Sequence, residues 1–135
     1  MARRVRCGRL PGLHVTPVGA ISVPLPILTA NEIEHEMIAL PGWEIRDGWL
    51  RRAYSTPGWS HTLLLAGQIA FLAEAAWHHP DLELGYARVV VKLQTHSVRG
   101  LTAMDFALAR RIEEQVSWQP DDASPLEGYP KKWMH

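Results

Sequence analysis

Two adjacent histidines, His78 and His79, stand immediately before Pro80 in the segment AEAAWHHPDLELGY. A third histidine, His96, and an acid, Asp105, follow further along the chain. Imidazole has an ordinary pKa of about 6.5, so it can donate or accept a proton at neutral pH. Because acid–base chemistry needs several such groups in one place, these residues are the first candidates for a functional site.

The element that must position the histidine pair is the longest predicted helix, residues 56–79. Thr56 is expected to cap this helix, with Pro57 in its first turn. Because Pro80 restricts the residue before it to extended conformations, the helix is expected to end at one of the two histidines. The inward stripe is predicted to consist of Leu65, Ile69, Ala73 and Ala76, widened by Leu64, Phe71 and Leu72.

Each candidate side chain also has a purely structural explanation. Glu74 and His78 are four residues apart and share one helix face, whereas His79 points elsewhere. A histidine at a helix C-terminus can simply complement the macrodipole, and Glu74 can be a solvated surface carboxylate. Asp105 fits the acid of a capping box in the last helix. Spacing alone leaves both interpretations open.

The first half of the domain has clear boundary signals. Thr29 and Glu32 form a capping box that starts a helix, and Pro41-Gly42 ends it. Asp47-Gly48 predicts a two-residue β-hairpin, because the turn type needs positive φ at both positions. The expected hairpin register places Ile45 opposite Leu50 and Glu44 opposite Arg51.

The second half predicts strand and then helix. Residues 83–96 alternate apolar and polar side chains, and Gly85 indicates a bulge or a break between two strands. Thr102 and Asp105 open a final helix whose inward residues are expected to be Phe106, Ala109, Ile112 and Val116. The order predicts an α+β fold, α-β-β-α-β-(β)-α, in which three helices lie on one face of an antiparallel sheet of three to four strands.

Composition restricts the possible classes of protein. The chain has 135 residues, 47% hydrophobic and 21% charged, which predicts one packed domain. Basic and acidic residues both number 14, so no net field attracts nucleic acid. No apolar run approaches the roughly 20 residues that span a bilayer. The single Cys7 excludes an intramolecular disulfide and favours a reducing, cytoplasmic setting.

We expect the packed domain to comprise residues 28–117. Residues 1–27 are expected to form an irregular extension, because prolines interrupt their apolar stretches; a targeting leader is the less favoured interpretation of their four arginines. Residues 118–135 are expected to form an irregular tail. Trp133 and Met134 near its end are expected to be free; docking on the domain or on a partner is the less favoured alternative.

Several other chemistries lack their sequence signals. The chain has no His-Glu-x-x-His motif and no cysteine pair, and adjacent histidines rarely ligate one metal ion together. It also lacks the Gly-x-Ser-x-Gly nucleophile motif and a glycine-rich phosphate loop. The sequence therefore predicts no metal site, no serine or cysteine nucleophile and no phosphate-binding loop.

The spacing of the candidate residues resembles the signature of the pterin-4a-carbinolamine dehydratases. That pattern is Glu74, three residues, His78-His79-Pro80, five residues, Tyr86, nine residues, His96, eight residues and Asp105. The flanking LPGWE, THSVRGLTAMD and ALARRIEEQ segments are similar as well, and the resemblance covers about residues 28–117. Tyr54 and Trp59 depart from it where the family tends to carry phenylalanine.

This resemblance implies loss of water from 4a-hydroxytetrahydropterin, giving the quinonoid dihydropterin without any cofactor. It implies that His78 and His96 are the acid and base and that His79 orients the pterin. Asp105 would orient a histidine or the substrate. Glu74 and Tyr86 are further candidate substrate contacts.

The resemblance also implies partners. It leads us to expect a homodimer or homotetramer, and an aromatic amino acid hydroxylase as the possible source of the pterin. The alternative is a non-catalytic binding, assembly or dimerisation factor on the same fold, because a fold alone does not determine function.

Overall fold

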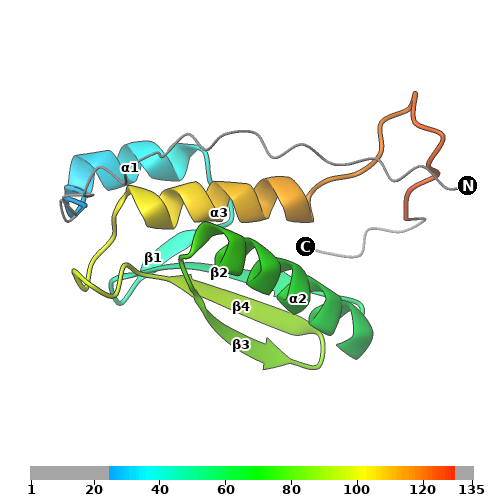
Figure 1. Ribbon diagram of the computed structural model, residues 1–135, viewed down its shortest axis with the longest axis horizontal. Helices are drawn as coiled ribbons and strands as arrows, with labels where there is room; N and C mark the ends of the chain where they lie inside the picture. The colour runs from blue at the N-terminus through cyan, green and yellow to red at the C-terminus, as the bar shows by residue number, and fades with distance from the viewer. Residues whose placement is uncertain (1–24, 130–135) are drawn as a thin grey trace, which may run out of the picture.

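Seven helices and strands follow one another in the computed structural model, which describes residues 25–129 (Figure 1). The helices are α1 (Ala30–Ile38), α2 (Trp59–Ala76) and α3 (Ala103–Val116). The strands are β1 (Glu44–Arg46), β2 (Trp49–Ser55), β3 (Asp81–Gly85) and β4 (Arg88–Leu93). They form one antiparallel sheet in the order β1-β2-β4-β3, with the three helices on one face. The α+β prediction is confirmed, and the optional fourth strand is present.

The hairpin between β1 and β2 has the predicted register. Glu44 pairs with Arg51 and Ile45 pairs with Leu50. The turn residues Asp47 and Gly48 have φ values of 53° and 78°, the left-handed conformation that this type of turn requires.

Gly85 marks the break between β3 and β4, the second of the two predicted alternatives. A turn at residues 86–87 joins the strands, and Asp81 at the start of β3 pairs with Lys92 near the end of β4. The alternation predicted for β4 is confirmed, because Val89, Val91 and Leu93 are fully buried beneath the helices.

The predicted boundaries of α2 are wrong at both ends. Gly58, not Thr56, is the N-cap residue. The Thr56 backbone N–H donates to Ala87 O, which extends the sheet pairing, and its hydroxyl donates to Gly58 O. The helix ends at Ala76 because Trp77 adopts a left-handed conformation, before the histidines are reached.

Of the residues predicted to face inward from α2, four are buried and three are not. The buried members are Leu65, Ile69, Leu72 and Ala73. Leu64, Phe71 and Ala76 are exposed. Ala76 is the last residue of the helix, and Leu64 and Phe71 lie on the side of the helix that faces away from the sheet.

Helix α3 is tied to the sheet by one carboxylate. Glu113 Oε1 accepts hydrogen bonds from Trp43 Nε1 (2.8 Å), Arg52 Nε (3.1 Å) and the Tyr54 hydroxyl (2.6 Å). Burial, together with this bond to Glu113, raises the pKa of Tyr54 well above its usual range. Tyr54, one of the two positions that depart from the family pattern, therefore packs in the core, and its hydroxyl also bonds to α3.

Several expectations fall outside the described residues. Cys7, most of the N-terminal extension, and Trp133 and Met134 lie in residues 1–24 and 130–135. Residues 118–129 contain neither helix nor strand. Within residues 25–129, no helix is both long and apolar enough to cross a membrane.

Candidate functional site

The segments that carry the candidate histidines lie at one end of the molecule, on the left in Figure 1. The end of α2, the start of α3 and the loop that follows β4 come together there. The pairing of Asp81 with Lys92 sets the segment after His79 beside the end of β4, which leads to His96. Asp105 reaches the same region from the first turn of α3.

His78 and Asp105 form a buried pair at this end. His78 Nε2 lies 2.7 Å from Asp105 Oδ1, and the two residues are 8% and 0% exposed. The segment after α2 turns inward through two backbone hydrogen bonds, from His78 N to Ala73 O and from Trp77 N to Glu74 O. These two bonds are the Schellman motif of a helix C-terminus. They direct the His78 side chain toward the core.

The second oxygen of Asp105 accepts two further hydrogen bonds. The Thr95 hydroxyl donates to Oδ2 at 2.8 Å and the Thr102 backbone N–H donates at 2.9 Å. The two threonine hydroxyls lie 2.7 Å apart, and the Met104 N–H donates to Thr102 Oγ1. With these donors directed at the carboxylate, the remaining contact is best satisfied when His78 Nε2–H donates. The Nδ1 atom of His78 is then the nitrogen available for proton exchange.

Thr95 was missed by sequence reasoning as a site residue, and Thr102 was identified only as a cap. Thr95 follows β4, and its N–H donates to Gly100 O in an isolated antiparallel bridge. Only this loop closure brings the Thr95 hydroxyl to Asp105. The sequence signal for Thr95 was limited to its position beside His96.

His79 has a different environment. Its Nε2 lies 2.8 Å from Glu74 Oε2, and the two side chains are 51% and 69% exposed. The predicted sharing of a face by Glu74 and His78 is therefore wrong. Because α2 stops at Ala76 and the chain turns at Trp77, His79 comes back over Glu74 while His78 turns inward.

His96 is exposed and lies beside an aromatic ring. Its ring centroid is 5.9 Å from that of Trp49, with an interplanar angle of 77°. Lys92 Nζ lies 5.8 Å from the same Trp49 ring. His96 thus has an aromatic neighbour, whereas His78 and His79 each have a carboxylate partner.

Tyr86 lies away from the histidines in this chain. It occupies the turn between β3 and β4, and its backbone carbonyl accepts a hydrogen bond from the Thr62 hydroxyl. Its phenol lies against Gly58, at the start of α2, whereas the histidines follow the end of α2. Its assignment as a substrate contact stays a prediction.

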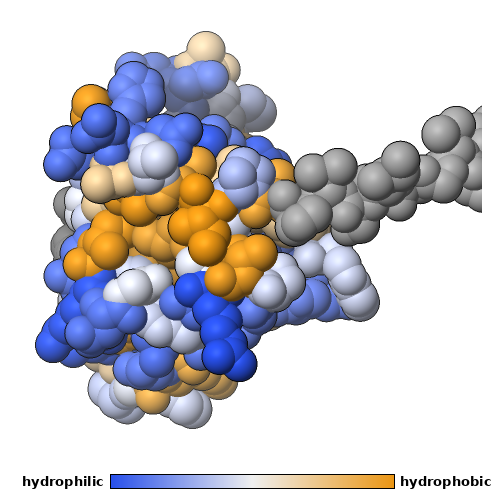
Figure 2. Space-filling model, turned by 90° about the vertical axis from the view of Figure 1, so that its left-hand side faces the viewer, coloured by the Kyte–Doolittle hydropathy of each residue, from blue (hydrophilic) through white to orange (hydrophobic). Residues whose placement is uncertain are grey.

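A shallow pocket of about 220 Å³ reaches His78. Ala76, Met104, Ala107, Leu108 and Arg111 complete its lining. Figure 2 views the molecule from this end and shows apolar residues gathered between hydrophilic ones. An organic substrate can therefore meet both apolar surface and ionisable groups here.

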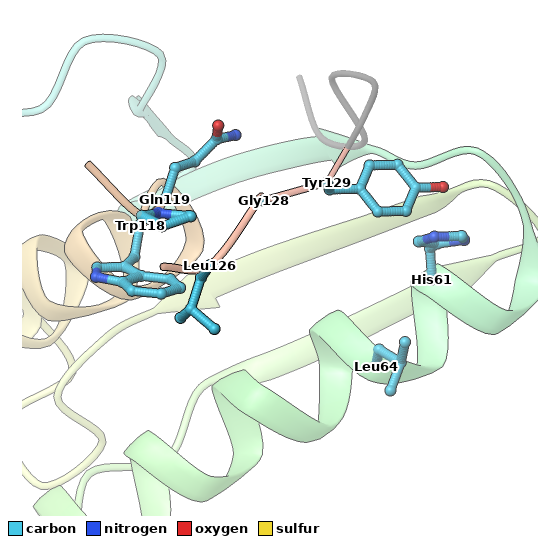
Figure 3. A pocket seen from close by; sticks show the side chains of 8 residues that line it. His61, Leu64, Trp118, Gln119, Leu126, Gly128 and Tyr129 are labelled. Atoms are coloured by element: carbon cyan, nitrogen blue, oxygen red, sulfur yellow. The ribbon is translucent and has the colours of Figure 1, made fainter. Parts of the chain in front are cut away.

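A larger pocket, of about 360 Å³, lies between α2 and the segment after α3 (Figure 3). His61 and Leu64 line it from α2, and Trp118, Leu126 and Tyr129 line it from the following segment. None of the predicted site residues contributes to it, so size alone does not identify the functional site. Among residues 25–129, no group of three or more His, Cys, Asp or Glu side chains could hold a metal ion.

The three helices and the four-stranded antiparallel sheet define a small α+β protein, in which His78 and His79 are each hydrogen-bonded to a carboxylate. The chain belongs to the pterin 4 alpha carbinolamine dehydratase family, because the model of that family matches residues 26–115.

Relatives of known sequence and structure agree with this assignment. A protein of Aquifex aeolicus, provisionally named a pterin-4-alpha-carbinolamine dehydratase, is 43% identical over 89 residues, which cover 66% of this chain and 90% of the relative. A relative with the same provisional name from Roseiflexus castenholzii is 38% identical over 90 residues, covering 67% and 97%. The crystal structure of a transcriptional coactivator/pterin dehydratase from Brucella melitensis is similar with a TM-score of 0.62 and 33% identity, covering 65% and 96%.

Proposed function

We propose that this protein dehydrates 4a-hydroxytetrahydropterin to the quinonoid dihydropterin. The observation that carries the proposal is the buried His78–Asp105 pair, followed directly by the exposed His79. The loop after β4, which contains His96, lies at the same end of the molecule. A buried, hydrogen-bonded histidine beside exposed histidines is suited to moving protons rather than to filling a core.

The reaction needs one proton delivered and one removed. The C4a–O bond breaks, and an acid must protonate the departing hydroxyl so that it leaves as water. The N5–H bond breaks, and its electrons form the C4a–N5 double bond while a base takes the proton. Imidazoles of His78 and His96 fill these two roles, each contributing about 10²- to 10⁴-fold to the rate.

The other residues support these groups. Asp105 accepts from His78 Nε2–H, which fixes the tautomer and leaves Nδ1 to exchange a proton. Glu74 holds the His79 ring, which contacts and orients the pterin. No oxidation state changes in this step, so the chain's own side chains are sufficient for the chemistry.

The exposed apolar side of α2 supports a homodimer or homotetramer. Leu63, Leu64 and Phe71 are all exposed on this helix, and β1 and β3 are open sheet edges. The same surface supports the alternative function, a non-catalytic binding or assembly factor, because it could instead receive a different protein. A partnership with an aromatic amino acid hydroxylase would also need such a surface.

The deciding experiment is an absorbance assay with chemically generated 4a-hydroxytetrahydropterin. The wild-type protein should accelerate dehydration, and His78→Ala should lose most of that acceleration. His35→Ala, on the exposed side of α1, is the matched control and should behave as wild type. A wild-type protein that gives no acceleration would disprove the dehydratase proposal and favour the binding function.

A further inference from the structure

Trp77 occupies a position that a tryptophan fits poorly. It is the residue of the Schellman motif that adopts the left-handed conformation, with φ 52° and ψ 40°. Glycine or asparagine is usual there, because a bulky side chain makes this conformation costly. The indole is also 75% exposed, so burial in the chain does not offset that cost. Neither local conformation nor packing accounts for this residue.

The Trp77 ring lies against one of the candidate histidines. Its centroid is 5.3 Å from that of His79, with an interplanar angle of 78°. Glu74 holds the same histidine from the side of α2. A flat ligand that hydrogen-bonds to His79 would therefore come within reach of the exposed indole.

We propose that the Trp77 indole is a stacking surface for the bicyclic ring of the pterin that His79 contacts. This inference rests on the proposed dehydratase function and assigns a substrate-binding residue to it. A pterin is a planar heteroaromatic system, and such rings stack on exposed indoles much as nucleic acid bases do.

The surroundings of His96 repeat this arrangement. Trp49, from β2, lies edge to face with His96, so each of the two exposed candidate histidines has an indole beside it. The two indoles come from different segments: Trp77 follows the end of α2 and Trp49 begins β2. The competing explanation for Trp77 is that it packs against a second copy of the chain.

The test compares Trp77→Asn with Trp77→Phe. Asparagine tolerates the left-handed conformation, so Trp77→Asn should keep or raise the melting temperature while removing the stacking surface. The binding probe is 7,8-dihydrobiopterin, which does not react, and Trp77→Asn should raise its dissociation constant by about tenfold. The same variant should raise KM by a similar factor and change kcat by less than about threefold. Trp77→Phe should stay close to wild type in both, because it retains an aromatic face.

The control is Trp59→Phe at the other end of α2, which should leave probe binding unchanged. If Trp77→Asn binds the probe as wild type does, the inference is overturned while the dehydratase proposal stands. If Trp77→Asn dissociates the oligomer in light scattering and weakens the probe only in the dissociated form, Trp77 is an interface residue instead. If wild type neither binds the probe nor shows activity, the proposed function fails first and this inference with it.

Discussion

Two capping boxes in this protein have the same sequence pattern and different surroundings. Thr29 and Glu32 start α1, and Thr102 and Asp105 start α3; in both, the acid accepts the backbone N–H of the cap residue. Glu32 is exposed to solvent. Asp105 is completely buried; its Oδ2 atom accepts the Thr102 N–H of the capping box, and its Oδ1 atom faces His78.

Burial makes the second box part of the candidate site. In water, the spare oxygen of a capping carboxylate is solvated and imposes nothing on its neighbours. In a dry environment, an unpaired carboxylate oxygen is costly, so Asp105 must be satisfied by side chains of fixed geometry. Thr95 and His78 meet that requirement, and in doing so His78 is held in one orientation.

The largest expected effect is that of His78→Ala. Turnover should fall by about 10³-fold, the loss expected for a proton-transferring group. Position at an element end alone suggests a stability change of about 1 kcal/mol or less. Burial beside Asp105 changes that expectation, because the substitution leaves a buried acceptor unpaired, which costs about 2 kcal/mol. Steady-state kinetics and urea unfolding measure the two effects, and unchanged turnover would exclude catalysis by His78.

Asp105→Asn tests the buried box directly. The amide can accept from Thr102 and Thr95 through its oxygen, but its NH₂ then faces His78 and requires the opposite tautomer of the imidazole. Turnover should fall by about 10²-fold or more while circular dichroism stays unchanged. Glu32→Gln is the matched substitution in the exposed box and should leave kcat as it is. Equal effects of the two variants would show that burial does not distinguish the boxes.

Thr95→Val sharpens the comparison by removing one donor to Asp105 without changing the size of the side chain. We expect a loss of about 1 kcal/mol in the free energy of unfolding and a several-fold lower kcat. Thr95→Ser retains the hydroxyl and should recover most of the turnover. If valine and serine variants have the same kcat and the same pH profile, Thr95 has only a structural role.

The smallest expected effect is a change in the pKa of Glu32, in the exposed capping box of α1. The backbone hydrogen bond from Thr29, and then the bond from its side chain, lower the pKa of Glu32. A lowered folded-state pKa stabilises the fold above the unfolded-state pKa, and this contribution is lost as pH falls through the folded-state value. Thr29→Ala removes the hydroxyl but keeps the backbone N–H, so in an NMR titration it should raise the Glu32 pKa only part of the way to its usual value. An unchanged midpoint would mean that the Thr29 hydroxyl does not contribute to the lowered pKa.

Features of this protein that depend on neighbours in the chain were predictable. The turn at Asp47-Gly48 and both capping boxes follow from a few consecutive residues, and the alternation in β4 from residues two apart. The register of β1 and β2 follows directly from that turn. These features are decided by backbone sterics and short-range hydrogen bonds, which operate before distant segments meet.

The sequence by itself therefore determined the element order, the α+β class and the residue types that can move protons. The tertiary structure decided which of those residues are in contact: it pairs His78 with Asp105 and His79 with Glu74, adds Thr95, and places Tyr86 elsewhere. The physical reason is that burial and hydrogen-bond partners are properties of the assembled core. A carboxylate at the same position of the same motif is a surface cap in one place and the anchor of a histidine in another, depending on what packs around it.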